Sequence, residues 1–137
     1  MSTAVPTAPA ELVRALLAAL AGGVTGDALA AFFTPDAEQL EHPNRMTPAG
    51  ARRDLAAMLT GAERGKALMA AQRYDVHTLL VDGDRVAAQV AWEATTAIAL
   101  GALPAGHVFR AHLAMFFELA GGRVRRITNY DCYAPSP

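Results

Sequence analysis

Residues 72–96 read QRYDVHTLLVDGDRVAAQVAWEATT and form two runs, rich in apolar and β-branched residues, that meet at Asp82-Gly83-Asp84. An Asp-Gly pair between two alternating runs is a strong hairpin signal, because glycine adopts the backbone conformation that a tight turn requires. Residues 107–133, HVFRAHLAMFFELAGGRVRRITNYDCY, repeat this design around Gly121-Gly122. The second half of the chain is therefore predicted to be an antiparallel meander.

The first half of the chain has helical spacing instead. Four leucines behind Pro9 predict a helix over residues 9–21, which the glycine pair at 22–23 ends. A short helix is predicted through DALAAFF at 27–33, and a third from Thr47-Pro48 to about residue 61, with 63–71 as a further turn or a mobile cover. Helices followed by a meander predict an α+β domain whose helices pack on one face of the sheet.

The composition limits the class of protein. The 137 residues, 53% of them apolar, suit a single domain over 1–137 with an ordered core from about residue 9 to 133. A net charge of -1, and basic residues that form no stripe with aromatic ones, argue against nucleic-acid binding. No apolar run reaches the roughly 18 residues that a membrane span requires. One cysteine, Cys132, and a first stretch without a secretory pattern predict a cytoplasmic protein.

The histidine of QLEHPN, residues 39–44, is the most distinctive polar residue of the first half. Side chains alternate between the two faces of a strand, and Leu40 is interpreted as an inward residue of the extended segment EQLEH. His42 is then expected on the same inner face, where Pro43 ends the strand.

The last two predicted strands supply the rest of a cavity. Ile127, Asn129 and Asp131 share one face of the final strand. The strand before it carries a continuous apolar stripe, formed by Phe109, Ala111, Leu113, Met115 and Phe117. An apolar cavity with a few polar groups is the usual composition of a small-molecule site.

Three stretches resemble the nuclear transport factor 2-like superfamily, especially its ketosteroid isomerase-like and SnoaL-like polyketide cyclase branches. They are ALAAFFTPDAEQLEHP at 28–43, LLVDGDRVAAQVAWEAT at 79–95 and AMFFELAGGRVRRITNYDCY at 114–133. The resemblance covers nearly the whole chain. It implies a cone-shaped, curved antiparallel sheet wrapped around about three N-terminal helices, with a pocket at the wide end.

The resemblance also implies functional positions. His42 stands where ketosteroid isomerases carry their catalytic aspartate, and a neutral imidazole can abstract a proton next to a carbonyl group. The oxyanion hole of these isomerases is not recognisable, because its tyrosine falls near Leu16 or Leu17 and its aspartic acid near Met115. Limonene-epoxide-hydrolase relatives use an Asp-Arg-Asp set, where this chain has ATTAIAL (94–100) and Asn129. Neither chemistry is therefore expected.

The candidate catalytic residues are His42 as base or acid, Asn129 as amide donor and Asp131 as orienting carboxylate; SnoaL-like cyclases similarly rely on an acidic residue of the final strands. Each has a structural alternative: a histidine bonded to a backbone carbonyl or to Asp131, an asparagine that caps a bulge, and an aspartate paired with Arg45 or Arg126. Tyr74 and Trp92 flank a flat ligand or fill the core. The predicted substrate-binding residues are Leu16, Leu40, Tyr74, Trp92, Phe109, Leu113, Met115, Phe117 and Ile127.

No metal ion or cofactor is expected. His107 and His112 are five residues apart, so in a regular strand they point to opposite faces, and the other histidines offer no better spacing. No glycine-rich loop follows a strand and opens a helix, as a nucleotide site would require.

The expected partners are an apolar small-molecule ligand and a second copy of the chain. A flat outer sheet face with Val108, Arg110, His112, Phe116 and Tyr130 suits a two-fold interface. The leading hypothesis is a cofactor-independent isomerase, cyclase or lyase that uses general acid-base catalysis on a small apolar carbonyl compound, polyketide-like or steroid-like. The alternatives are a non-catalytic binding domain of the same fold and a dimeric assembly module.

Overall fold

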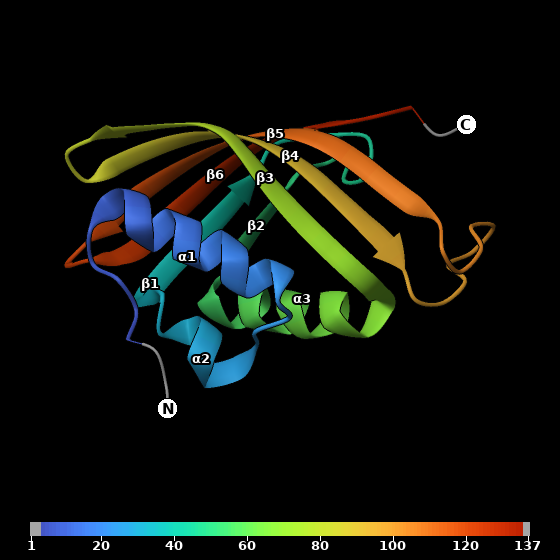
Figure 1. Cartoon of the computed structure of the whole chain (residues 1–137), viewed down its shortest axis with the longest axis horizontal. Helices are drawn as coiled ribbons and strands as arrows, with labels where there is room; N and C mark the ends of the chain where they lie inside the picture. Colours follow the sequence, from blue (N-terminus) through green and yellow to red (C-terminus); the bar gives the residue numbers. More distant parts are fainter. Residues whose placement is uncertain (1–3, 136–137) are drawn as a thin grey trace.

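The structure is a computed structural model that describes residues 4–135 (Figure 1). Its helices are α1 (Pro9–Ala21), α2 (Gly26–Ala30) and α3 (Leu55–Leu68). Its strands are β1 (Phe33–Glu41), β2 (Ala51–Asp54), β3 (Met69–Asp82), β4 (Arg85–Thr96), β5 (Val108–Ala120) and β6 (Arg123–Tyr133). The residues beyond the predicted ordered core, 1–8 and 134–137, fall partly outside the described residues. Within 4–135, none of the helices has the length and apolar character to cross a membrane.

The strands form one curved, open sheet in the order β2-β1-β6-β5-β4-β3. Both predicted hairpins are confirmed, since β3 pairs with β4 and β5 with β6 in antiparallel register. The β1 and β6 pair is parallel, which is the one departure from the antiparallel sheet that was expected. All three helices lie on one face of the sheet (Figure 1), so the predicted α+β architecture is confirmed.

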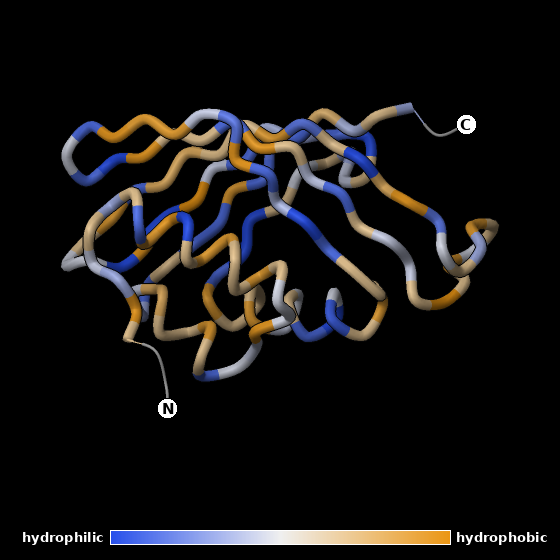
Figure 2. The backbone as a smooth tube through the Cα atoms, in the orientation of Figure 1, coloured by the Kyte–Doolittle hydropathy of each residue, from blue (hydrophilic) through white to orange (hydrophobic). Residues whose placement is uncertain are grey.

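Helix α1 supplies the core of the helix layer. Pro9 stands in its first turn, and Gly22 ends it by donating its N–H to the oxygen of Ala18 at 2.9 Å. The buried residues of α1 lie on one side of the helix and pack on the inner face of the sheet; they are Leu12, Val13, Leu16 and Leu17. Hydrophilic and hydrophobic residues alternate along the strands (Figure 2), and the stripe predicted on β5 is buried from Ala111 to Phe117 at every second residue.

The third helix begins later than the sequence predicts. The oxygen of Thr47 accepts the N–H groups of both Asn44 and Gly50, which makes a turn where a helix start was expected. Residues 51–54 then form β2 along β1, and α3 begins at Leu55. Asp54 caps this helix, because its side chain accepts a hydrogen bond from the N–H of Ala57 at 2.8 Å. The helix start predicted at Thr47-Pro48 is therefore wrong, and the helix begins only after the short strand β2.

Gly50 closes the turn between β1 and β2. Its φ is +70°, and a Cβ atom there would lie 2.8 Å from the oxygen of Glu41. We expect Gly50→Ala to lower the free energy of unfolding by about 1–3 kcal/mol, because left-handed backbone strain adds to this contact. Urea unfolding measures the loss. The control is Gly101→Ala, which has a φ of +57° but open space around its Cβ; an equal loss in the two variants would show that the contact with Glu41 costs nothing.

Candidate functional site

A cleft of about 540 Å³ lies between the helices and the inner face of the sheet. Helices α1, α2 and α3 provide a wall of mainly small and apolar residues, whereas β1, β2 and β3 provide a polar floor. The polar side chains that line the cleft are Gln39, Glu41, Arg53, Lys66, Gln72 and Tyr74. The volume is typical of a small-molecule site, and the floor is more polar than the cavity that the sequence predicts.

A chain of hydrogen bonds crosses the floor from β2 to β6. Arg53 Nη1 donates to Gln39 Oε1 at 3.5 Å, and Gln39 Nε2 donates to Asn129 Oδ1 at 2.9 Å. Asn129 Nδ2 then donates to Asp131 Oδ1 at 3.4 Å. Asn129 is only 5% exposed, and both ends of its amide group are engaged in this chain. All the donors point the same way, and the chain ends on the carboxylate of Asp131.

Glu41 is the charged carboxylate of the floor. Burial opposes its ionisation, but hydrogen bonds from Asn44, Thr47 and Arg53 outweigh burial and lower the pKa of Glu41 below its ordinary value. The ion pair between Arg53 Nη1 and Glu41 Oε1 is 2.9 Å long, and Asn44 Nδ2 donates to Glu41 Oε2 at 2.7 Å. Glu41 therefore stays ionised and holds Arg53 in place.

Asp131 has the opposite shift. Burial is the largest cause and the negative charge of Glu41 the second, and together they raise the pKa of Asp131 despite the hydrogen bond from Asn129 and the charge of Arg53. Its side chain is half-buried on the inner face of β6. It is not among the residues that line the cleft, and it is joined to the lining residue Gln39 through Asn129. Two neighbouring carboxylates thus have pKa values that are pushed apart, which is a common arrangement of acid-base sites.

Tyr74 is the neutral donor of the site. Burial, and then the charge of Asp131, raise the pKa of Tyr74 to about 12, so its hydroxyl stays protonated at neutral pH. That hydroxyl donates to Gln72 Oε1 at 3.3 Å, and the same oxygen accepts Trp92 Nε1 at 3.0 Å. Tyr133, whose ring meets that of Trp92 edge to face, also has its pKa raised to about 12, by burial and by Asp131.

His42 lies on the face of the sheet opposite to the cleft. Its ring stacks on Tyr130, with centroids 4.3 Å apart and planes at 17°. The register pairs Leu40 with Thr128 and Glu41 with Asn129, so Leu40 and His42 face outward when Asn129 faces the core. The inward placement predicted for His42 and Leu40 is wrong.

The remaining predicted residues divide into three groups. Asn129 and Asp131 lie on the inner face as predicted and are joined by a hydrogen bond, and Tyr74 and Ile127 line the cleft. Trp92 is bonded to the lining residue Gln72, and Phe109 packs edge to face on His107 near Tyr133, outside the cleft. The predicted lining residues that are instead buried in the core are Leu16, Leu113, Met115 and Phe117. The alternative partners of Asp131 are also wrong, because Arg126 pairs with Glu38 and Glu118, and Arg45 donates to the backbone oxygen of Ala134.

Most of the polar floor, including Gln39, Glu41 and Arg53, does not follow from the sequence pattern. Leu40 is not the inward residue of β1, because all the helices of the described chain lie on the other face, and the outer face itself carries apolar side chains. The correct signal is the pair Phe33 and Ala37, both buried, which share their face with Gln39 and Glu41.

Across residues 4–135, no three side chains of His, Cys, Asp or Glu lie close enough together to hold a metal ion. Cys132 is exposed on β6, one residue from Asp131 but on the other face of the strand. A ligand in the cleft would meet the amide, carboxylate, guanidinium, ammonium and phenol groups of the floor and its rim.

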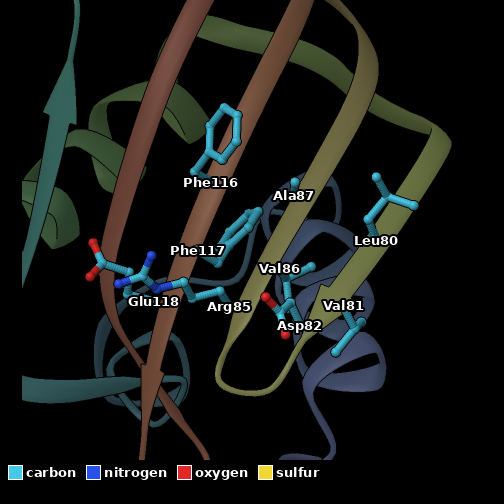
Figure 3. A pocket seen from close by; sticks show the side chains of 9 residues that line it. All are labelled: Leu80, Val81, Asp82, Arg85, Val86, Ala87, Phe116, Phe117 and Glu118. Atoms are coloured by element: carbon cyan, nitrogen blue, oxygen red, sulfur yellow. The ribbon is translucent and has the colours of Figure 1, made fainter.

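A second hollow, of about 350 Å³, lies at the β3–β4 hairpin (Figure 3). Its residues come from β3, β4 and β5 and include Leu80, Val81 and Phe116, whose side chains are among the most exposed large apolar ones of the described chain. The side chains of Arg85 and Glu118 lie at its edge on paired positions of β4 and β5. This hollow lies apart from the polar floor and belongs to the outer face.

Residues 13–127 match the family model of the SnoaL-like domain. Among solved structures, IdmH from Streptomyces antibioticus, a candidate polyketide cyclase, has a TM-score of 0.74 and 22% identity over 90% of this chain and 91% of that chain. A SnoaL-like polyketide cyclase from Agrobacterium tumefaciens has a TM-score of 0.67 and 20% identity over 96% and 92%. A Catenulispora acidiphila protein with a ketosteroid isomerase-like fold, in complex with trimethylamine, has a TM-score of 0.66 and 19% identity over 88% and 84%. At these identities the likeness shows the fold, and a search of curated proteins found no significant match.

Proposed function

The chain belongs to the SnoaL-like domain family, and we propose that it is a cofactor-independent cyclase, isomerase or lyase that acts on an apolar carbonyl compound. Asp131 is the residue that takes up and returns a proton. The observation that carries this proposal is the chain of hydrogen bonds that joins Arg53 and Gln39 in the cleft, through Asn129, to the half-buried carboxylate of Asp131. The opposite directions in which the pKa values of Glu41 and Asp131 are shifted support it. A carboxylate with a raised pKa is a stronger base than an ordinary one and is closer to the pH at which proton transfer is most efficient.

The proposed reaction starts with the ionised carboxylate of Asp131. It removes a proton from the carbon next to a carbonyl group, which yields a protonated Asp131 and an enolate. In an isomerisation, the enolate is conjugated with a C=C bond of the substrate and takes the proton back at the far carbon of that bond. In a cyclisation, the α-carbon of the enolate instead attacks a second carbonyl carbon, whose oxygen becomes an alkoxide. Protonated Asp131 returns the proton to the carbon or to the new alkoxide, so the enzyme ends in its starting state.

Two groups of the floor are placed to stabilise the enolate oxygen. Tyr74 remains a donor at neutral pH, and its bond to Gln72 is long enough at 3.3 Å for a substrate oxygen to compete. Arg53 adds a fixed positive charge at the cleft surface. Gln39 and Asn129 do not contact the substrate in this proposal, because their hydrogen bonds orient the carboxylate of Asp131.

Hydrogen-deuterium exchange on a bound ketone tests this function. 1-Tetralone is a suitable probe, because it has an apolar two-ring body and acidic protons next to its carbonyl group. NMR in D₂O should show faster exchange of these protons with the protein than with buffer or with an equal amount of an unrelated protein. Saturable binding without faster exchange would contradict the enzyme proposal and favour the non-catalytic binding domain.

We also propose that two copies of the chain associate through the outer sheet face. Three aromatic rings gather there, since Tyr130 stacks on His42 and meets Phe116 edge to face at 5.9 Å. The charges of the face occur in matched pairs, with Arg126 Nε bonded to Glu38 at 2.8 Å and Arg126 Nη1 3.5 Å from Glu118. A face with compensated charges and exposed rings suits an identical partner.

Phe116→Glu tests the association. Phe116 is 48% exposed, and a carboxylate in its place would have to lose its water in the interface, so we expect the variant to be monomeric at concentrations at which the parent is dimeric. Light scattering coupled to size exclusion measures the mass. Ile98→Glu, at a residue 50% exposed in the β4–β5 loop, is the control and should leave the mass unchanged. A monomeric parent at high concentration would contradict the dimer.

A further inference from the structure

The eleven glycines of the chain fall into three groups by their geometry. Eight have positive φ angles, which other residues adopt with strain. Gly22 ends α1, where an added Cβ would lie 3.3 Å from the oxygen of Ala18. At Gly61 and Gly65 neither the backbone conformation nor a close contact requires glycine. Their φ angles are ordinary, and an added Cβ would meet no atom within 4 Å.

These two glycines weaken the helix in which they stand. Glycine is one of the least favourable residues in a helix interior. The apolar side chains of α3 that pack on the core, such as Met58 and Leu59, are only partly buried. Both line the cleft, and they are four residues apart, so they lie on one face of α3 a turn from each other. The empty space above them is therefore cleft volume and not space that another part of the chain fills.

We propose that Gly61 and Gly65 form a bare backbone wall against which a flat apolar ring of the ligand packs. Glycine allows such close approach of a backbone to a ligand. The opposite side of the cleft presents Glu41, Arg53 and Tyr74, so the ligand turns its oxygen substituents to the sheet and its ring face to α3. The two glycines thus set the size of the ring system that the cleft accepts. This inference rests on the cleft as the ligand site of the proposed function, and not on proton transfer.

The experiment measures binding and stability, and needs no turnover. The variants are Gly61→Leu and Gly65→Leu, and the probes are cyclohexanone, with one ring, and 1-tetralone, with two. Leucine has high helix propensity, so each variant should raise Tm by roughly 2–5 °C. The added side chain occupies the cleft, so the affinity for 1-tetralone should fall at least about tenfold, while that for cyclohexanone changes much less. NMR titration of the backbone amides measures both affinities and locates the probe.

The control is Ala67→Leu, at an exposed residue of α3 that does not line the cleft. It should leave both affinities unchanged. The inference is overturned if both glycine variants keep the parent affinity for 1-tetralone, or if the probe shifts no amide of the cleft in the parent protein. Loss of binding in the glycine variants together with no proton exchange in the parent would keep this inference and reject the catalytic proposal.

Discussion

Replacement of Asp131 by Asn should lower the rate of proton exchange on 1-tetralone by roughly 10²- to 10⁴-fold, the usual contribution of a positioned general base. Asparagine keeps the shape of the side chain and its acceptor for the Asn129 amide, so the affinity for the ketone should stay within about threefold. In the parent protein the rate should rise with pH as Asp131 loses its proton, with a midpoint above 3.8, because the pKa of Asp131 is raised. The Asp131→Asn variant should lack this rise.

The same substitution should not destabilise the fold. A carboxyl group whose pKa is higher in the folded than in the unfolded state contributes stability at low pH and loses it as pH rises through the folded pKa. At pH 7 the ionised carboxylate of Asp131 therefore destabilises the folded state, and the neutral amide of asparagine does not. Asp131→Asn should unfold at the parent Tm or above it. The control is Asp75→Asn, at an exposed residue paired with Arg73, which should change neither rate nor pH profile. If the Asp131→Asn variant exchanged protons at the parent rate, the assignment of Asp131 as the general base would be wrong.

Phe117→Ala should lower the free energy of unfolding by about 3–5 kcal/mol, the usual cost of emptying a large buried aromatic site. Phe117 is 1% exposed and stands in the stripe of β5 that belongs to the same core cluster as α1. The loss has two parts: the free energy of transferring the removed ring atoms from water to the core, and the cost of the cavity left between the sheet and α1. Its size therefore depends on how far α1 can move to fill the cavity. Urea denaturation of both proteins, with equal slopes, measures it.

The control for Phe117 is Leu80→Ala, since Leu80 is 65% exposed at the same end of the sheet. It should cost less than about 1 kcal/mol, because little apolar surface leaves water there on folding. Equal losses in the two variants would mean that the buried stripe does not dominate the core.

The parts of the fold that follow from local chemistry could be predicted from the sequence. The turn residues at Gly83 and at Gly121-Gly122 fix two hairpins, and the four leucines behind Pro9 fix α1. The start of α3 could not be read in the same way. Thr47-Pro48 has the chemistry of a helix start, but the pairing of residues 51–54 with β1 depends on the neighbouring strand and not on local preference.

The site residues could be predicted on a strand whose apolar residues lie on one face only. They could not be predicted on a strand with apolar residues on both faces. On β6, Ile127 and Asn129 are buried beside Phe117 and Met115 of β5, so alternation places Asp131 correctly. On β1, apolar residues occur on both faces, because the outer face carries its own aromatic cluster. Leu40 alone therefore could not show whether His42 or Glu41 faces the core. Phe33 and Ala37, which are buried and come earlier in β1, could show it.

The parallel pairing of β1 with β6 joins residues 33–41 to residues 124–129, which lie far apart along the chain. The proposed site thus needs residues from both β1 and β6. Gln39 and Glu41 of β1 are synthesised early, and Asn129 and Asp131 of β6 are synthesised much later. Contacts of such long sequence separation close late and slowly during folding. Under the proposed mechanism, proton transfer requires the last strand to be docked, so a nascent chain, or one shortened to end before β6, should be inactive even where its helices and first hairpin have already formed.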